Sequence, residues 1–285
     1  MHIQDYFQPT TLSQALEYMH SGGRVKALAG GTDLVIALHE RTLEADAVVD
    51  LTQVAELKEI SLQADGLHIG AMATFTDLEG SEVVRQHCPM LSCAASKVGS
   101  PQVRNSGTIG GNLANAATAA DTVPVLMAMD ALAVLKRAEG CRVVPVTQIP
   151  TGLNQTCLAP DELITEFILK PRPGSFMDFE KIGRRRALAI SRINMAMVLD
   201  MEDGLIRGAA VAYGAVGKTA YRATELEEFL VGKRLDSQLE DAAAGVAEEL
   251  VTRVLQGRKT TPYKKKIAAA VLRRALEKAM GGVQA

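Results

Sequence analysis

The stretches Ala27-Leu-Ala-Gly-Gly-Thr-Asp-Leu34 and Thr108-Ile-Gly-Gly-Asn112 decide the fold of this chain. A protein binds an anionic pyrophosphate well when it points backbone N–H groups at the phosphate oxygens. Glycine permits positive φ and places no Cβ between backbone and phosphate, while Thr and Asn add side-chain donors. Either turn alone is typical of a tight connection between elements. Both together, in the first half of one chain, indicate a dinucleotide site.

The elements around the first stretch follow from local patterns. A strand is expected at residues 25–29, and Asp33 is placed to cap a helix over residues 34–38, which puts the glycine turn at that helix's positive end. An earlier helix over residues 12–19 has Thr10 or Thr11 as its cap and ends at Gly22-Gly23. The second stretch is reached through a polar, glycine-rich segment, residues 99–111.

The remaining pattern predicts two domains and an α+β fold. The segment Pro171-Arg-Pro-Gly174 cannot continue a helix or a central strand, so we expect domains at residues 1–173 and 174–285. In the first, helices are expected at residues 90–98 and from Pro124 onward, and strands at residues 47–49, 67–69, 131–135, 142–146 and 163–169. In the second, strands at 176–182, 194–200 and 205–212 precede helices at 223–230, 239–254 and 262–280. Strands followed by helices predict an antiparallel sheet with its helices on one face.

Composition excludes several classes of function. The 285-residue chain has a net charge of −2, 4% aromatic residues and no Trp, which argues against binding nucleic acid. No secretory signal and no run of about 20 apolar residues is present, so we expect no membrane span and a cytoplasmic location. No motif of a Rossmann site, P-loop, nucleophile elbow or zinc helix occurs. We therefore expect no catalytic acid, base or nucleophile in this chain.

The cysteines and the charged clusters have plain interpretations. Cys88, Cys93, Cys141 and Cys157 form no C-x-x-C pair, so we expect reduced thiols in or near the core and any metal cofactor in another chain. Asp121, just before the Pro124 helix, is either a helix cap or an acceptor for sugar or ribityl hydroxyls. The run Arg184-Arg185-Arg186, and the basic residues 264–266 and 273–274, indicate solvated or inter-subunit faces.

These residues resemble the flavin subunits of the molybdenum hydroxylases, the xanthine dehydrogenase family. The turn Ala29-Gly-Gly-Thr-Asp-Leu34 is similar to that family's first FAD loop. The run Gly99-Ser-Pro-Gln-Val-Arg-Asn105, then Thr108-Ile-Gly-Gly-Asn-Leu-Ala-Asn115 and Ala119-Ala-Asp121, is similar to the second loop and its following acid. The segment Phe179-Glu-Lys-Ile-Gly-Arg-Arg-Arg186 resembles the opening of the C-terminal flavoprotein domain. Order and spacing agree across nearly the whole chain, and bacterial xanthine dehydrogenase FAD subunits look most similar.

The resemblance implies a two-lobed FAD-binding domain of the vanillyl-alcohol oxidase and enolpyruvyl reductase type, followed by an α+β flavoprotein domain. Residues 27–34 would wrap the pyrophosphate, and residues 108–112 would face the diphosphate and flavin from the other lobe. Asp121 would accept from a sugar or ribityl hydroxyl, Ile164 would pack near the ring, and Lys181 would reach the flavin. The implied cofactor-binding residues are thus Ala27, Leu28, Ala29, Gly30, Gly31, Thr32, Asp33, Leu34, Thr108, Ile109, Gly110, Gly111, Asn112, Asp121, Ile164 and Lys181.

The resemblance also implies a function for the chain. It would be the FAD-carrying electron-transfer subunit of an oxidoreductase, beside a molybdopterin-binding large subunit and a small subunit with 2Fe-2S clusters. Xanthine or a related N-heterocycle would be hydroxylated in the complex. Residues 187–190 lack the acids that help govern acceptor access in some relatives, so the acceptor is left as NAD⁺ or another. The alternatives are a self-contained flavin oxidase or reductase, the flavin subunit of an aldehyde or carbon monoxide dehydrogenase, and an assembly protein without flavin.

Overall fold

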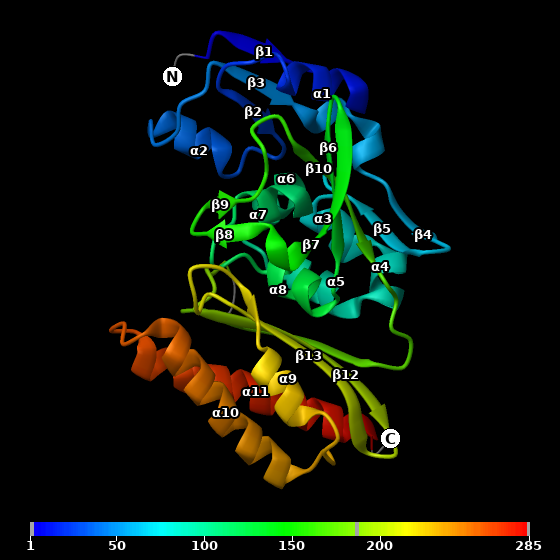
Figure 1. Ribbon diagram of the computed structural model, residues 1–285, viewed down its shortest axis with the longest axis vertical. Helices are drawn as coiled ribbons and strands as arrows, with labels where there is room; N and C mark the ends of the chain where they lie inside the picture. Colours follow the sequence, from blue (N-terminus) through cyan, green and yellow to red (C-terminus); the bar gives the residue numbers. More distant parts are fainter. Residues whose placement is uncertain (1–2, 186–187, 284–285) are drawn as a thin grey trace.

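The computed structural model describes residues 3–185 and 188–283, and its three larger sheets and their helices are stacked along one long axis (Figure 1). The first sheet is parallel, in the order β1-β3-β2. Its elements are β1 (Asp5–Phe7), α1 (Leu12–Met19), β2 (Val25–Leu28), α2 (Leu34–His39) and β3 (Ala47–Asp50). Thr11, not Thr10, caps α1 by accepting a hydrogen bond from the Gln14 N–H. Positive φ at Gly22 and Gly23 turns the chain after α1.

The second sheet is antiparallel, in the order β4-β5-β10-β6-β7. Its strands are β4 (Ile60–Gln63), β5 (Gly66–Gly70), β6 (Leu132–Arg137), β7 (Gly140–Pro145) and β10 (Leu163–Leu169). The 3-10 helices η1 (Leu51–Gln53) and η2 (Ala55–Leu57) connect β3 of the first sheet to β4. Between β7 and β10 lie η3 (Val146–Gln148) and a two-stranded sheet of β8 (Pro150–Gly152) and β9 (Gln155–Thr156). The helices of the second sheet are α3 (Phe75–Gly80), α4 (Glu82–His87), α5 (Pro89–Ser96), α6 (Pro101–Ser106), α7 (Ile109–Ala114) and α8 (Thr122–Ala128). Figure 1 shows these helices between this sheet and the C-terminal one.

The polar, glycine-rich segment of residues 99–111, with the turn predicted at residues 108–112, is largely helical. Ser100 accepts from the Val103 N–H and begins α6, with Pro101 in the first turn. Thr108 accepts from the Gly111 N–H at 3.1 Å and begins α7, so the second glycine pair opens a helix. The prediction of a turn was wrong because the Thr108 cap and tertiary packing of α7 together offset the low helix propensity of two glycines. Similarly, α8 begins at Thr122 rather than at Pro124.

The C-terminal part is a four-stranded antiparallel sheet with helices, in the order β11-β12-β13-β14. Its elements are β11 (Phe176–Ile182), β12 (Ile193–Glu202), β13 (Leu205–Gly214), β14 (Tyr221–Arg222), α9 (Thr224–Leu230), α10 (Ser237–Leu255) and α11 (Thr261–Val283). Met195, Met197 and Leu199 face the core shared with α10 and α11. The alternate residues Ala196 and Val198 face the core that contains α8. The sheet therefore has its own helices on one face, as predicted, and helices of the preceding part on the other.

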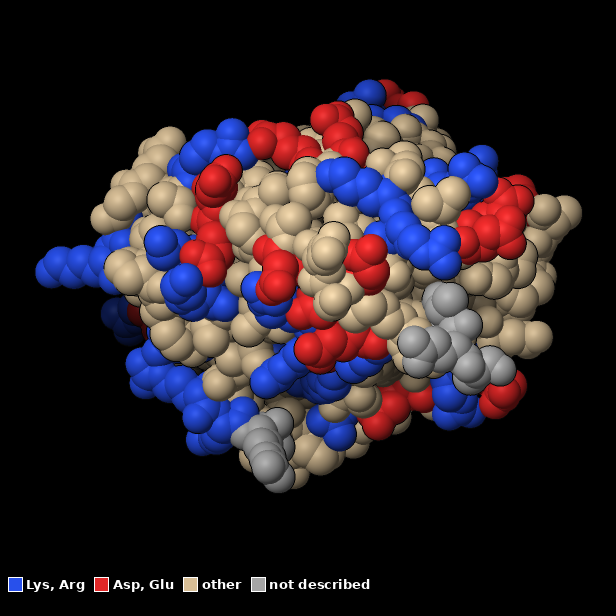
Figure 2. Space-filling model, turned by 90° about the horizontal axis from the view of Figure 1, so that it is seen from below, with Lys and Arg blue, Asp and Glu red and all other residues tan. Residues whose placement is uncertain are grey.

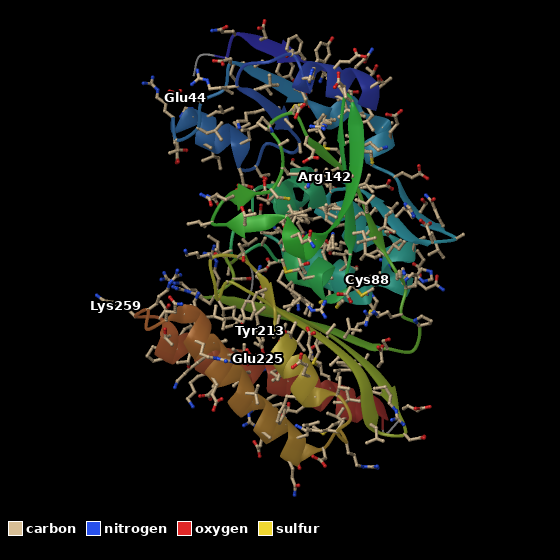
Figure 3. All side chains as sticks on the ribbon, viewed as in Figure 1. Glu44, Cys88, Arg142, Tyr213, Glu225 and Lys259 are labelled. Carbon is tan, nitrogen blue, oxygen red and sulfur yellow. The ribbon has the colours of Figure 1, made fainter. Side chains whose placement is uncertain are left out.

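The cysteines are all free thiols in different surroundings. Cys88 is fully buried, and burial raises the pKa of its thiol to about 12. Figure 3 shows Cys88 in the helical layer and Tyr213 in the C-terminal core. Cys93 and Cys157 are half-buried, whereas Cys141 is exposed on the outer strand β7. The prediction of thiols in or near the core was wrong for Cys141, because one face of an outer antiparallel strand meets solvent.

Candidate functional site

The two glycine motifs meet at a cleft of about 520 Å³, within the usual range for cofactor sites. The loop after β2 forms one wall, α7 forms another, and the start of β10 closes the third side. Of the predicted site residues, the cleft is lined by Ala27, Ala29, Gly30, Gly31, Thr32, Asp33, Leu34, Thr108, Gly110, Gly111, Asn112 and Ile164. Sequence segments about 80 residues apart therefore converge on one cavity.

Two of the glycines are required by packing between segments of backbone. A Cβ on Gly30 would lie 1.7 Å from the Ser106 carbonyl oxygen, and one on Gly110 would lie 2.7 Å from the Ala71 carbonyl oxygen. Gly30 and Gly110 therefore let the first loop and α7 approach their neighbours. Gly31 has φ of +71°, which a residue with a side chain adopts only with strain. Gly111 is the glycine whose Cβ position lies toward the opposite wall, 3.8 Å from the Ala29 Cβ.

The two motifs differ in the backbone donors that they leave unpaired. Around α7, the N–H groups of Ile109, Gly110 and Asn112 donate to backbone carbonyls, and that of Gly111 donates to its cap. Within the described part of the chain, no acceptor pairs with the N–H groups of residues 30–33. Four successive peptide units therefore carry free donors beside the cleft, an arrangement that attracts anions. Unpaired backbone donors are therefore found in the first motif, whereas the N–H groups of the second motif are paired within the protein.

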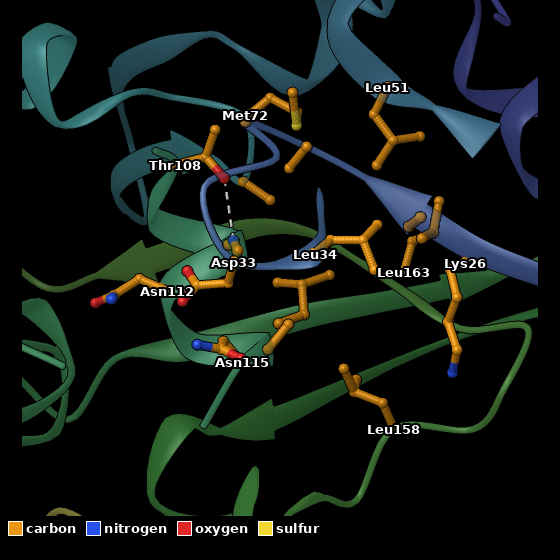
Figure 4. Close-up of a pocket in the computed structure, with 18 of the residues that line it drawn as sticks. Lys26, Asp33, Leu34, Leu51, Met72, Thr108, Asn112, Asn115, Leu158 and Leu163 are labelled. Atoms are coloured by element: carbon orange, nitrogen blue, oxygen red, sulfur yellow. Dashed lines mark hydrogen bonds between the residues drawn. The ribbon is translucent and has the colours of Figure 1, made fainter. Parts of the chain in front are cut away.

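Side chains supply the polar contribution of the second motif. The Asn112 Oδ1 accepts from the Thr122 hydroxyl at 2.7 Å, which leaves the Asn112 amide N–H groups for a ligand. Asn115, one turn of α7 later, also lines the cleft. Figure 4 shows Asp33, Asn112 and Asn115 grouped on one side, with the Thr108 bond to the Gly111 N–H dashed. The prediction that Asp33 caps α2 was wrong, because its side chain makes no capping hydrogen bond. Its carboxylate accepts from the Thr32 hydroxyl at 3.4 Å and has further positions to accept from another hydroxyl.

The opposite side of the cleft is mainly apolar, with Lys26 and Glu162 as its charged residues. Figure 4 shows Leu51, Leu158 and Leu163 apart from the polar group. Ile164, predicted to pack near a ring, belongs to this wall and is 7% exposed. Glu162 lines the same side, where the Arg142 guanidinium donates two hydrogen bonds of 2.7 Å to it and holds its pKa below the ordinary value. A polar half and an apolar half suit a ligand that joins phosphates to a flat ring system.

Four predicted site residues do not line the cleft. Leu28 packs against α2 and Ile109 is buried in the core. Asp121 and Lys181 lie beyond the Asn112 end, because Thr122, the residue after Asp121, bonds to Asn112. The two form an ion pair of 2.5 Å with side chains 7% and 9% exposed. Asp121 precedes α8 without capping it, so the interpretation as a helix cap was wrong.

Sequence reasoning missed two partners of Asp121, Ser191 and Asn194. The Ser191 hydroxyl donates to the Asp121 Oδ1 at 2.6 Å, and the Asn194 amide donates to the same oxygen at 2.7 Å. Asn194 lies at the start of β12, in its buried portion over residues 193–199, and Ser191 lies two residues before the strand begins. A buried Asn in such a strand is a signal, because interior amides need partners.

The basic clusters occupy different surroundings. Arg184 and Arg185 are exposed, whereas Arg186 and Ala187 lie outside the described residues. Lys264 is half-buried and donates to the Ala215 carbonyl; burial and the nearby charges of Arg192 and Arg258 lower its pKa. The expectation of a fully solvated face was therefore wrong at Lys264. In Figure 2, Lys and Arg gather at the left end of the C-terminal part, the end where Figure 3 places Lys259.

Metal sites and membrane-spanning helices are absent from the part of the chain that the structure describes. Among residues 3–185 and 188–283, no His, Cys, Asp and Glu side chains form a group of three or more that could hold a metal ion. Within the same residues, every helix is too short or too polar to cross a bilayer.

Comparison with known proteins gives the class of this chain. Residues 1–173 match a family described as the FAD binding domain in molybdopterin dehydrogenase, and residues 179–279 match the CO dehydrogenase flavoprotein C-terminal domain. The nicotinate dehydrogenase FAD-subunit of Eubacterium barkeri is 35% identical over 95% of this chain and 94% of its own length. The xanthine dehydrogenase FAD-binding subunit of Escherichia coli O157:H7 is 32% identical over 87% and 86%. A chain of the Cu,Mo-CO dehydrogenase crystal structure superposes with a TM-score of 0.90 at 30% identity, covering 97% and 98%.

Fold, cleft and relatives together define a flavoprotein subunit of an oxidoreductase. The chain belongs to the family of FAD-binding subunits of the molybdenum hydroxylases, which includes the xanthine, nicotinate and CO dehydrogenases. Its cofactor is FAD, and in this family molybdopterin and 2Fe-2S clusters are carried by partner subunits.

Proposed function

We propose that this chain holds one FAD in the cleft between residues 29–34 and α7, and that it passes electrons from 2Fe-2S clusters of a small subunit to NAD⁺ or another acceptor. The observation that supports the site is the run of unpaired N–H groups at residues 30–33, which the cofactor's pyrophosphate would occupy. Gly111 and Asn112 would complete the phosphate end, and the wall with Ile164 would receive a ring. When bound, FAD supplies the redox chemistry, and this chain supplies position and electrostatics.

The assembly and its substrate belong to the same proposal. A large subunit with molybdopterin would hydroxylate an N-heterocycle, such as xanthine or a related purine. The relatives that support an N-heterocycle act on nicotinate and on xanthine according to their names. We also propose that the chain divides into domains at residue 173 and that the complex is cytoplasmic.

Binding of FAD to a glycine variant tests the cleft. We expect Gly111→Leu to weaken FAD binding by roughly a hundredfold, or about 2.7 kcal/mol, because the new side chain would fill the space before Ala29. Gly245→Leu is the matched control, since Gly245 lies in the exposed interior of α10 with nothing near its Cβ position. The measurement is the visible spectrum of the purified chains, followed by FAD titration of the deflavinated proteins.

Each outcome bears on a separate part of the proposal. A folded wild-type chain that is colourless and takes up no FAD would contradict FAD binding by this chain. Equal FAD affinity for the Gly111→Leu variant and the Gly245→Leu control would contradict the location of the site. Turnover of a small molecule by the isolated flavinated chain would contradict the role as an electron-transfer subunit.

A further inference from the structure

Asp121 is held by three donors that all come from the C-terminal part of the chain. Its Oδ1 accepts from the Ser191 hydroxyl at 2.6 Å and from the Asn194 amide at 2.7 Å. Its Oδ2 accepts from the Lys181 ammonium at 2.5 Å. The carboxylate is 6% exposed and Asn194 is fully buried, so water contributes little to either group. The rotamer of Asp121 is therefore fixed by Lys181 of β11 and by Ser191 and Asn194 rather than by its own helix.

The orientation of the Asn194 side-chain amide has an energetic cost, because it leaves a buried oxygen without a hydrogen-bond partner. Its N–H groups donate to the Ala120 carbonyl at 3.2 Å and to Asp121, while its Oδ1 is buried without a partner. The reversed amide would place that oxygen against two acceptors, so this orientation is the favourable one. An unsatisfied buried carbonyl nevertheless destabilises the fold. The fold therefore loses some stability at Asn194, whose amide supplies the second hydrogen-bond donor to Asp121 Oδ1.

Counting the remaining hydrogen-bond positions shows what the cluster offers a ligand. A carboxylate oxygen accepts about two hydrogen bonds, so Oδ1 of Asp121 is saturated and Oδ2 keeps one position. The Lys181 ammonium donates to the Lys97 carbonyl and to Asp121, which leaves one of its three donors. One acceptor and one donor therefore remain side by side. The hydroxyl of Thr122, the residue after Asp121, donates to the Asn112 Oδ1, so Asp121 and Lys181 lie next to the Asn112 end of the cleft.

We propose that Ser191 and Asn194 are positioning residues of the FAD site. They hold Oδ1 of Asp121 so that Oδ2 stays free to accept from one hydroxyl of the cofactor's sugar-like chain. This inference rests on the proposed function, since it requires that FAD occupies the neighbouring cleft. Neither residue touches the cofactor in this role. The C-terminal part of the chain would then set the affinity of a site whose lining residues belong to the preceding part.

The experiment is FAD titration of the full deflavinated chain. Ser191→Ala and Asn194→Leu are each expected to weaken FAD binding by roughly tenfold, because each frees the Asp121 carboxylate to rotate. Ser191→Thr keeps the hydroxyl and is expected to restore binding to within about twofold. The control is Ser92→Ala in α5, which removes a similarly buried hydroxyl that donates to the Glu79 carbonyl. It should lower the melting temperature and leave FAD affinity unchanged.

Measurements at a temperature where every variant is folded separate positioning from stability. A positioning role also changes the visible circular dichroism of bound flavin in Ser191→Ala and Asn194→Leu, which Ser92→Ala should not change. Wild-type affinity and spectra in both variants would overturn the inference while leaving FAD binding intact. Absence of FAD binding by the wild-type chain would instead overturn the proposed function. If Ser191→Thr does not fold, comparing the FAD affinity of Asn194→Leu with that of Ser92→Ala still tests the positioning role.

Discussion

Gly30 and Gly111 occupy similar places in their motifs, yet their surroundings differ. The Cβ position of Gly30 is filled by the backbone of Ser106, whereas that of Gly111 meets the Thr108 hydroxyl oxygen at 2.9 Å and then opens toward Ala29. Gly30 is thus required for the two walls of the cleft to meet, and Gly111 shapes the space between them. Gly245, inside α10, meets nothing at all.

Alanine at Gly30 and at Gly245 should have opposite effects on stability. We expect Gly30→Ala to lower the free energy of unfolding by about 3 kcal/mol or more, because backbone cannot yield as a side chain does. Gly245→Ala should raise it by about 1 kcal/mol, since alanine restricts the unfolded chain and favours a helix. Urea unfolding of both variants makes the measurement. A Gly30→Ala protein as stable as the wild type would show that the walls can separate freely.

The sequence predicts which residues gather at the cleft better than it predicts what each one does. Gly31, Thr32 and Asp33 follow a strand, and that local order suffices to place them in a loop. The contact of Gly30 with Ser106 joins residues far apart in the chain, which no local pattern encodes. The same holds for Asp121, whose partners come from β11 and β12.

At the scale of elements, the long strands and helices follow their sequence patterns closely, as do the short helices α2 and α9, whereas α6 and α7 do not. The predicted segment 176–182 coincides with β11, and α10 and α11 extend the predicted helices by a few residues at their ends. By contrast, α6 and α7 have six residues each, too few to be stable without tertiary packing. Their caps, Ser100 and Thr108, were the available signals.

His68 joins strand β5 to β10 in a pH-dependent way. Its ring bonds to Glu166 and to Asp65, each at 2.9 Å. Burial lowers the pKa of His68, but hydrogen bonds from its ring to the Glu166 and Asp65 carboxylates outweigh burial and raise the pKa above its ordinary value. A raised pKa in the folded state stabilises the protein fully below the unfolded value of about 6.5, and the contribution is lost as pH rises through the folded value.

Replacing His68 should therefore lower the free energy of unfolding most at acidic pH. We expect His68→Gln to destabilise the chain more at pH 5.5 than at pH 8.5, because the neutral amide gains nothing from protonation. Urea unfolding of both proteins at the two pH values (roughly one unit below and two above the ordinary His pKa) checks this. An equal difference at both pH values would mean that His68 does not change its protonation on folding.

At the scale of the whole molecule, Arg222 joins the two parts of the chain. It donates to the Met127 carbonyl at 2.8 Å and pairs with Asp130, both at the end of α8. It also pairs with Glu227 at 2.6 and 2.9 Å, and these side chains are 17% and 11% exposed. Glu227 in turn accepts from the Val211 N–H. One guanidinium thus connects α8, β14 and α9.

Truncating Arg222 should loosen this junction. We expect Arg222→Ala to lower the free energy of unfolding by about 3 kcal/mol, because Glu227 is left nearly buried and without its cation. Arg222→Lys should recover little, since an ammonium cannot reproduce the planar fork of donors. Calorimetry measures the loss. A lysine variant that melts with the wild type would contradict the geometric argument.

The burial of α8 has a consequence for how such chains can be recombined. All seven residues of Thr122–Ala128 are buried, and the helix lies against both β12 and β13. A chimera joined at residue 173 would bring together one parent's α8 and another parent's sheet. Only parents with matching side chains on those two surfaces would yield a folded product. A junction at residue 173 is easy to place in the sequence, yet the surfaces of α8 and of the β12–β13 sheet have to come from the same parent, or from parents in which they match.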